Sequence, residues 1–335
     1  MEIILVTGAN GEIGHGLIPK LAEKKHKVVA LDVADLDESL KPYTAEFIKG
    51  SVLEKNILES LFTKYQFSEV FHLAALLSTS AEKNPENAQA VNAGGTATLL
   101  DVVNKFARKE KREIKFIFPS TIAVYGFPSL EIKSKFGPVK EDDYLKPITM
   151  YGITKLYCEM LGKYYSSNYN LLENDGRSFI DFRSIRFPGI ISAITMPSGG
   201  TSDYAPEMIH SAAKGEGYES FVSQGTTIPF MVMPDAVKAL IQLSEVDKKI
   251  LTKLVYNVTS FSVSAEKIAQ LVNGVFPDSS ISYSPNPARQ KIVDSWPENT
   301  DDSAARKDWG WKPDFDIDKA FKEYLIPEIQ NKYKE

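Results

Sequence analysis

The sequence has few of the residues on which metal centres and disulfide-stabilised folds depend. Its 335 residues include one cysteine, Cys158, which excludes an internal disulfide and a cysteine-rich zinc site. Its four histidines, at positions 15, 26, 72 and 210, are scattered and lack the close spacing of a zinc-binding helix. We therefore expect no dedicated metal site.

Long basic and long apolar runs are missing as well. The formal net charge is −5 and no long basic run is present, so a non-specific nucleic-acid surface is not expected. The first apolar run, "IILVTG" at 3–8, is too short to cross a bilayer, and no basic segment precedes it. These absences predict a cytoplasmic globular protein that binds neither nucleic acid nor membrane, with one large domain or two modest ones.

Short apolar segments alternate with helical patterns through the first 190 residues. Strands that are apolar throughout and separated by helices indicate a parallel sheet covered on both faces, the doubly wound α/β fold. The expected strands cover 3–7, 27–31, 45–50, 69–75, 114–120 and 180–189. The expected helices cover 13–24, 54–65, 85–108 and 148–167.

The pattern becomes irregular after about residue 190, where proline, glycine and serine are more frequent. A strand over 254–260 and a helix over 264–273 are expected there. We therefore predict a cofactor-binding domain over 1–190 and a smaller C-terminal α/β substrate lobe over 191–330. The helix at 235–246 is expected to pack back on the first domain.

Three glycines mark the turn between the first strand and the first helix. In "VTGANGEIG", Gly8, Gly11 and Gly14 have the spacing G-x-x-G-x-x-G. Such glycines permit a tight turn and a close approach of a diphosphate to the backbone, where the helix N-terminus presents free N–H groups. Asp32 ends the second strand, where a carboxylate accepts ribose hydroxyls and repels a 2′-phosphate. The pattern predicts a Rossmann domain that binds NAD rather than NADP.

A tyrosine and a lysine four residues apart predict a proton-transfer site. Tyr151 and Lys155, in "YGITK", share one face of a helix. A nearby ammonium lowers the pKa of a tyrosine, so Tyr151 would take a proton from a substrate alcohol. The segment "PSTIAVYG" at 119–126 offers hydroxyls for the same substrate oxygen. On spacing alone, a surface helix pair is the alternative interpretation.

Together these motifs resemble the extended short-chain dehydrogenase/reductase family. "TGANGEIG", "HLAA", "VNAGGT", "PSTIAVYG" and "YGITK" occur in that family's order. The resemblance implies that Thr121 is the catalytic hydroxyl, where most members carry serine, with Ser120 as a second contact. It also implies that Asn92 supports the active-site backbone or a proton-relay water. The predicted cofactor-binding residues are Gly8, Asn10, Gly11, Glu12, Ile13, Gly14, Asp32, Ser51, Val52, Leu73, Ala74, Ala75, Asn92, Tyr151, Lys155, Phe187 and Ile190.

The loop "MPSGGTSDYAPE" at 196–207 bears on the substrate. It has hydroxyls, glycines and one aspartate but no lysine or arginine, so it suits a small zwitterion better than a diphosphate. Backbone N–H groups around 199–201 form a candidate nest for a substrate carboxylate. Asp203 either faces a substrate ammonium or caps the following helix. Arg289 and Lys291 keep a sugar-nucleotide substrate open, because they would bind a diphosphate.

The second half also resembles a narrower group. "RFPGIISAITMPSGGTSDYA", "IPFMVMPDAVKALIQL" and "DSWPENTDDSAARKDWGW" are similar to the short-chain, zinc-independent type of L-threonine 3-dehydrogenase. The resemblance implies NAD-dependent oxidation of the L-threonine β-hydroxyl to 2-amino-3-ketobutyrate. Tyr151 would remove the proton, Thr121 would hold the oxygen, and Lys155 would tune Tyr151 and bind the nicotinamide ribose. The predicted substrate-binding residues are Ser78, Ser120, Thr121, Tyr151, Gly189, Thr201, Ser202, Asp203 and Trp296.

Two other functions stay open from the residues. A nucleotide-sugar 4-epimerase or dehydratase would use the same general motifs. A cofactor-sensing regulator on the same fold is the third hypothesis, although such proteins commonly lose the tyrosine–lysine pair. The family resemblance further implies a homodimer in which the helices at 85–108 and 148–167 pair between subunits.

Overall fold

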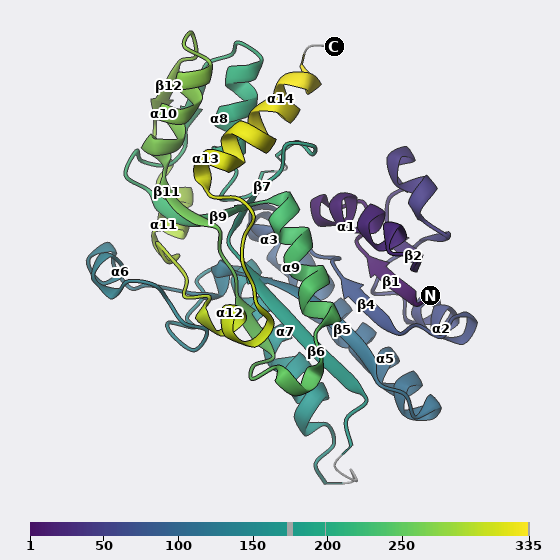
Figure 1. The fold of residues 1–335 in the computed structure, drawn as a ribbon. Coiled ribbons are helices and arrows are strands. Elements are labelled where there is room, and N and C mark those ends of the chain that lie inside the picture. The colour runs from purple at the N-terminus through teal and green to yellow at the C-terminus, as the bar shows by residue number, and fades with distance from the viewer. Residues whose placement is uncertain (173–176, 198, 334–335) are drawn as a thin grey trace.

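The computed structural model describes residues 1–172, 177–197 and 199–333. Its centre is a seven-stranded sheet, ordered β10-β6-β5-β4-β1-β2-β3, in which every pair of neighbouring strands is parallel (Figure 1). The predicted doubly wound parallel sheet is therefore confirmed. Its strands are β1 Ile3–Thr7, β2 Lys27–Asp32, β3 Glu46–Lys49, β4 Glu69–His72, β5 Ile114–Thr121, β6 Ile180–Phe187 and β10 Val255–Asn257.

Helices cover both faces of this sheet because successive strand residues point to opposite sides. Ile4 and Val6 of β1 pack with the helices of one face, and Leu5 packs with those of the other. The first face carries α1 Glu12–Glu23 and α9 Met233–Glu245. The second face carries α2 Lys55–Lys64, α5 Thr96–Glu110 and α7 Met150–Lys163.

The helix predicted over 85–108 consists of three segments in succession, which are α4 Pro85–Ala88, the π-helix η2 Gln89–Gly95 and α5. A further short helix, α3 Ser78–Lys83, precedes them. Asn84 and Pro85 separate α3 from α4, because the Asn84 side chain accepts a hydrogen bond from Asn87 N–H and Pro85 begins a new first turn.

The second half builds a smaller lobe around a separate core, which Ile122–Val124, Tyr125, Phe127 and Val139 of the first half also enter (Figure 1). One sheet joins β11 Phe261–Ser264, β9 Thr227–Val232 and β7 Gly189–Ile191, and another joins β12 Ile281–Tyr283 to β8 Tyr218–Ser220. No helix among the described residues is long and apolar enough to cross a membrane. The remaining α-helices are α6 Leu130–Phe136, α8 Tyr204–Ala213, α10 Ala265–Val275, α11 Pro287–Asp294, α12 Ser303–Trp309, α13 Ile317–Lys319 and α14 Ile326–Lys332. The short 3-10 and π segments are η1 Glu38–Tyr43, η3 Ile122–Val124, η4 Tyr164–Asn168, η5 Lys248–Ile250 and η6 Ala320–Leu325.

Parts of the second half return to the large sheet. Strand β10 pairs with β6, and α9 packs beside α1 on the same face. Trp309 and Trp311 join that core, with ring centres 5.7 Å apart. The division at residue 190 stays a prediction, and these contacts assign the segments 233–257 and 303–311 to the side of the large sheet.

Candidate active site

Two adjoining cavities lie at the carboxyl ends of β1, β4, β5 and β6, where the strand order reverses. Both are lined by Gly8, Gly11, Leu73 and Ala75. The first cavity extends past the end of β2. The second cavity extends toward the loop that precedes α8. The arrangement offers a two-part ligand one continuous path across the sheet edge.

The glycine turn has no room for side chains. Gly8 has φ +70°, and a Cβ there would lie 2.6 Å from Ala74 N. A Cβ on Gly14 would lie 2.0 Å from Ala9 O, so glycine is required where α1 starts against β1. Gly11 ends the turn at the N-cap of α1, where free N–H groups meet the cavity. This cradle fits the diphosphate of a dinucleotide.

Asp32 is fixed at the end of β2. Its carboxylate accepts hydrogen bonds from Asn10 N–H at 2.9 Å and from Ala34 N–H at 3.0 Å. It lines the first cavity together with Ser51, Val52 and Ala74. The Asn10 side chain binds the backbone of 34–37 instead and lines neither cavity, so Asn10 acts through Asp32.

Thr121, Tyr151 and Lys155 line the second cavity. Tyr151 and Lys155 lie on α7, and Thr121 ends β5. Helix α7 approaches the 3-10 segment η3, which directly follows β5, closely at Gly152, where a Cβ would lie 2.1 Å from Ala123 O. The Thr121 hydroxyl accepts a hydrogen bond from Ala123 N–H at 3.1 Å, which leaves its own proton free to donate.

Lys155 is 4% exposed and has a defined partner. Its ammonium donates to Pro119 O at 2.7 Å and lies 5.7 Å from the centre of the Tyr151 ring. Burial lowers the pKa of Lys155 to about 8, while the neighbouring Cys158 and Glu159 raise it. Burial also raises the pKa of Tyr151, and the Thr121 hydroxyl opposes this shift. The predicted lowering of the Tyr151 pKa is wrong, because burial outweighs the effect of the Thr121 hydroxyl.

Asn92 lies beneath the cavities rather than in them. Its side chain accepts from Leu76 N–H at 2.7 Å and donates to Leu76 O at 3.0 Å and to the Thr154 hydroxyl at 3.3 Å. These bonds connect the segment after β4 to α7. Asn92 therefore holds backbone in place and does not line either cavity.

The loop before α8 is held by its own aspartate. The Asp203 carboxylate accepts from Gly199 N–H at 2.9 Å and from Gly200 N–H at 2.5 Å. Asp203 makes no side-chain cap bond to α8, so the predicted capping role is wrong, while the predicted contact with a substrate ammonium stays a prediction, since Asp203 lines the second cavity. The proposed carboxylate nest is likewise filled by Asp203. Residue 198 of this loop lies outside the described residues.

Ser78 closes the other side of the same loop. Its hydroxyl accepts from Thr201 N–H at 3.1 Å and from the Thr201 hydroxyl at 3.0 Å, which leaves the Ser78 proton free. Arg289 donates to Gly200 O at 2.8 Å and lies over the Phe221 ring, so it braces the loop from outside. Neither Arg289 nor Lys291 lines the two cavities, so the diphosphate contact that a sugar-nucleotide substrate would need gains no support from the structure.

Most of the remaining predicted residues also line the second cavity. Ser120 is the one whose hydroxyl points elsewhere, because it donates to Glu159 at 2.5 Å. Glu12 also lines this cavity, and burial and the neighbouring Asp203 raise its pKa to about 7. The other predicted lining residues are Ile13, Phe187, Gly189, Ile190, Ser202 and Trp296. Lining residues that the sequence did not single out include Leu77, Pro119, Ile122 and Pro188.

Metal-ligating side chains do not gather anywhere in the part of the chain that the structure describes. There, no group of three or more histidine, cysteine, aspartate or glutamate residues is placed to hold an ion. His72 is buried and neutral, because burial lowers its pKa to about 3. Its ring binds the hydroxyls of Thr7 and Thr96, so it connects β1, β4 and α5.

Comparison with known proteins gives consistent similarities over nearly the whole chain. Residues 4–259 match the model of the NAD dependent epimerase/dehydratase family. The mitochondrial L-threonine 3-dehydrogenase of Bos taurus is 35% identical over 316 residues, which cover 94% of this chain and 79% of the bovine one. The X-ray structure of L-threonine dehydrogenase from Clostridium difficile has a TM-score of 0.87 at 34% identity, covering 99% of this chain and 98% of that one. A monomeric L-threonine 3-dehydrogenase from a metagenome has a TM-score of 0.85 at 36% identity, covering 98% and 99% of the two chains.

Proposed function

The chain belongs to the NAD dependent epimerase/dehydratase family, and from this we propose that it is an NAD-dependent L-threonine 3-dehydrogenase. The observation that carries the proposal is the convergence of Thr121, Tyr151 and Lys155 in one cavity with the loop at 199–203. The reaction is the oxidation of the threonine β-hydroxyl to give 2-amino-3-ketobutyrate. The missing diphosphate clamp makes a sugar-nucleotide substrate the weaker hypothesis.

The residues that line the two cavities fit the two halves of NAD. The glycine turn and the N-terminus of α1 would hold the diphosphate, and Asp32 would accept hydroxyls of the adenosine ribose. When bound, NAD supplies the acceptor for the hydride from threonine Cβ. Lys155, beside Tyr151, would bind the nicotinamide ribose.

Tyr151 is the proposed general base. Thr121 donates its hydroxyl proton to the substrate oxygen and so orients the alcohol toward the Tyr151 oxygen. Because burial raises the pKa of Tyr151, the positive charge of Lys155 is needed to favour the phenolate. Activity should therefore rise with pH until Lys155, with a pKa of about 8, loses its proton.

Ser78 and Thr201 are the proposed contacts for the amino-acid part of threonine, with Ser202 and Trp296 beside them. The free Ser78 proton suits a substrate carboxylate. A Cβ on Gly189 would lie 2.6 Å from the Phe230 ring and 3.3 Å from Ser202 Cβ, so glycine there makes room first for Phe230 of β9 and then for the loop. Ser120 is left out of this set, because its hydroxyl is bound to Glu159.

The decisive assay mixes the protein with NAD and L-threonine and follows NADH absorbance, with L-serine, 3-hydroxybutyrate and UDP-galactose in parallel. NADH formation with threonine is expected. Epimerisation of UDP-galactose without NADH from threonine would overturn the proposal. Tyr151→Phe should lower kcat by roughly 10²- to 10⁴-fold while NAD still binds, because it loses only the base.

We also propose a homodimer that pairs through α7. Apolar side chains form an exposed stripe on this helix: Ile153 is 48% exposed, Tyr157 48% and Met160 58%. Light scattering after size exclusion should give a dimer, and Tyr157→Glu should give monomers. Leu130→Glu, at an equally exposed position on α6, is the control and should remain a dimer. A monomeric wild-type protein, as described for the metagenome relative, would overturn this part.

A cytoplasmic location is proposed on the same footing. It is compatible with the single cysteine, Cys158, because the fold then depends on no internal disulfide and needs no oxidising compartment. The bovine relative is described as mitochondrial, so cell fractionation of the native source with NADH-forming activity as the marker is the test.

A further inference from the structure

A buried carboxylate on α7 is not used by the proposed chemistry. Glu159 follows Tyr151 and Lys155 at successive four-residue steps, so the three share one face of the helix. It is 3% exposed. Its two oxygens accept three hydrogen bonds, from the Ser120 hydroxyl at 2.5 Å and from Arg186 Nε at 2.9 Å and Arg186 Nη2 at 2.6 Å.

These contacts join three elements at the base of the cavity. Ser120 lies next to Thr121 at the end of β5, and Arg186 is the penultimate residue of β6. Lys155, one turn earlier on α7, holds Pro119 O at 2.7 Å. The two residues that precede Thr121 are therefore bound, one after the other, by two successive residues of the α7 face.

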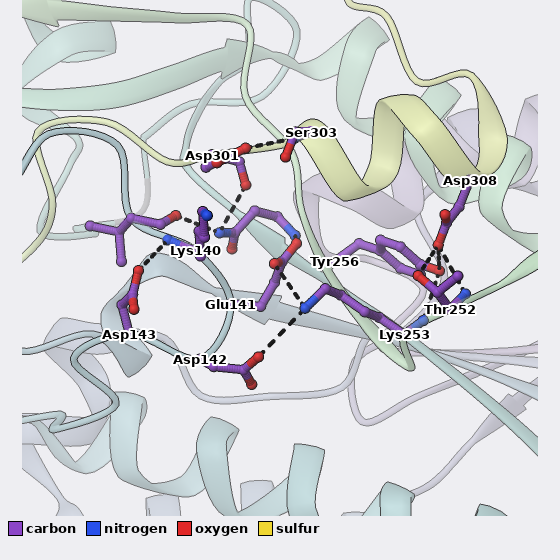
Figure 2. A network of polar contacts seen from close by, with 12 residues as sticks. Lys140, Glu141, Asp142, Asp143, Thr252, Lys253, Tyr256, Asp301, Ser303 and Asp308 are labelled. Carbon is purple, nitrogen blue, oxygen red and sulfur yellow. Dashed lines mark hydrogen bonds and ion pairs between the residues drawn. The ribbon is translucent and has the colours of Figure 1, made fainter.

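The ion pair is itself supported from the far side. Arg186 Nη1 donates to the Tyr125 hydroxyl at 2.9 Å, which donates to Asn257 Oδ1 at 2.7 Å. Arg186 also donates to the backbone of Glu141. Glu141 in turn binds Asn257 N–H and pairs with Lys253, where the network reaches the surface (Figure 2). A chain of satisfied polar groups thus runs from the surface to Ser120.

We propose that Glu159 is a positioning residue, which fixes α7 against the ends of β5 and β6 so that Tyr151 and Lys155 meet Thr121 in the reactive arrangement. Desolvating two charges in an ion pair is costly, and an apolar pair of similar size is often no less stable. The Glu159–Arg186 pair instead adds geometric specificity, because its two parallel hydrogen bonds fix how α7, β5 and β6 are placed relative to one another. The inference rests on the proposed function only for its kinetic readout.

A matched structural control lies on the same strand. Arg183 and Asp181 form an equally buried ion pair near the start of β6, with Arg183 Nη2 2.6 Å from Asp181 Oδ2. This pair also binds the carbonyl of Leu243 at the end of α9 and touches neither cavity. Asp181→Asn and Glu159→Gln each neutralise one buried carboxylate on or against β6, so they separate loss of stability from loss of positioning.

The experiment compares the two variants at saturating NAD and threonine. Glu159→Gln should lower kcat by about 10- to 100-fold with the Kd for NAD within about twofold of wild type. Asp181→Asn should keep kcat within about twofold at a comparable loss of melting temperature. The falling alkaline limb of kcat should also move to lower pH in Glu159→Gln, because Lys155 loses a neighbouring anion that raises its pKa. Equal kcat and equal pH profiles in the two variants would overturn the proposal.

Ser120→Ala provides a second route that leaves the ion pair intact. It should lower kcat without raising KM for threonine, and it should have little further effect in the Glu159→Gln background. A raised KM, or an additive double variant, would assign Ser120 to the substrate instead. If wild type forms no NADH from threonine, the proposed function fails. The positioning inference is then judged by deuterium exchange of the peptide 117–124, which should quicken in Glu159→Gln and not in Asp181→Asn.

Discussion

In the proposed reaction, the Thr121 hydroxyl donates a hydrogen bond to the substrate oxygen. The same oxygen accepts from Ala123 N–H, so this hydrogen bond already orients the side chain before substrate arrives. Serine keeps both bonds, whereas alanine removes both. Position 121 therefore needs a hydroxyl for two reasons: to donate to the substrate oxygen and to accept the hydrogen bond from Ala123 N–H.

For Thr121 we expect Thr121→Ala to lower kcat by roughly 10²- to 10³-fold, the usual cost of losing one donor to a reacting oxygen. Thr121→Ser is the matched control and should stay within about fivefold of wild type, because its hydroxyl can make the same two bonds. Steady-state rates of NADH formation measure both. An alanine variant with the rate of the serine variant would show that another group holds the oxygen.

Glu12 predicts a pH dependence of NAD binding. It lines the cavity at the N-terminus of α1, a position that favours an anion, yet burial and Asp203 raise its pKa to about 7. As pH rises through 7, Glu12 ionises and repels the diphosphate. The Kd for NAD should therefore increase between pH 6 and pH 8.

The variant Glu12→Gln cannot ionise, so its Kd should be nearly constant over this range and lower than that of wild type at pH 8. Isothermal titration of NAD at several pH values measures the difference. Asp203 and Tyr324 are the titratable groups whose electrostatic influence reaches Glu12, and both remain in the variant. A parallel pH dependence in the two proteins would assign the effect to another group.

At the scale of elements, the loop between β7 and α8, which is the proposed substrate loop, is organised by contacts that reach across the site. Asp203 holds Gly199 and Gly200 from within, Ser78 on α3 holds Thr201, and Arg289 on α11 holds the Gly200 carbonyl. The loop is thus bound by both lobes. Its geometry depends on a charge that lies inside it.

Asp203→Asn should loosen this loop, because a neutral amide accepts hydrogen bonds from N–H groups less strongly than a carboxylate does. A loss of about 1 to 2 kcal/mol in hydrogen bonding corresponds to a KM for threonine raised about 5- to 30-fold. The value of kcat should change less, since Tyr151 and Thr121 lie on other elements. Glu219→Gln, at an exposed position of β8, is the control and should leave KM unchanged. A KM unchanged in Asp203→Asn would contradict the role of the loop.

Local patterns predicted the elements that local residues determine. The strands β1 to β6 and the motif residues on α1 and α7 follow from apolar runs, glycine spacing and a tyrosine–lysine repeat. The Asp203 bonds, the Ser120–Glu159 contact and the pairing of β10 with β6 were not predicted, because each joins groups through tertiary geometry that periodicity does not contain. Glu159 did carry a local signal, since it repeats the four-residue step from Tyr151 to Lys155.

At the scale of the whole molecule, the two lobes share structure rather than meeting at one interface. Trp311 is 1% exposed and packs in the core that α1, α9 and the large sheet form together. Its chain position is far into the second half. Unfolding of the smaller lobe should therefore disrupt the covering of the large sheet.

Trp311→Ala should lower the free energy of unfolding by about 3 to 5 kcal/mol, the usual cost of removing a large buried aromatic side chain. Because the lobes share this core, the variant should still unfold in one transition. Urea denaturation followed by circular dichroism and by intrinsic fluorescence measures both points. Lys312→Ala, at the exposed neighbouring position, should change stability little; two separate transitions in Trp311→Ala would show independent lobes.

The pairing of β10 with β6 has a consequence for how the chain is made on the ribosome. Strand β6 is buried along its whole length, and its outer partner begins 68 residues after it ends (255 − 187). At about 5 to 20 residues per second, translation leaves this strand without that partner for roughly 3 to 14 s. During this interval β6 has an open edge that a second nascent chain can pair with. The order of synthesis thus makes the period before residue 257 emerges a time at which two nascent chains of this protein can misassemble.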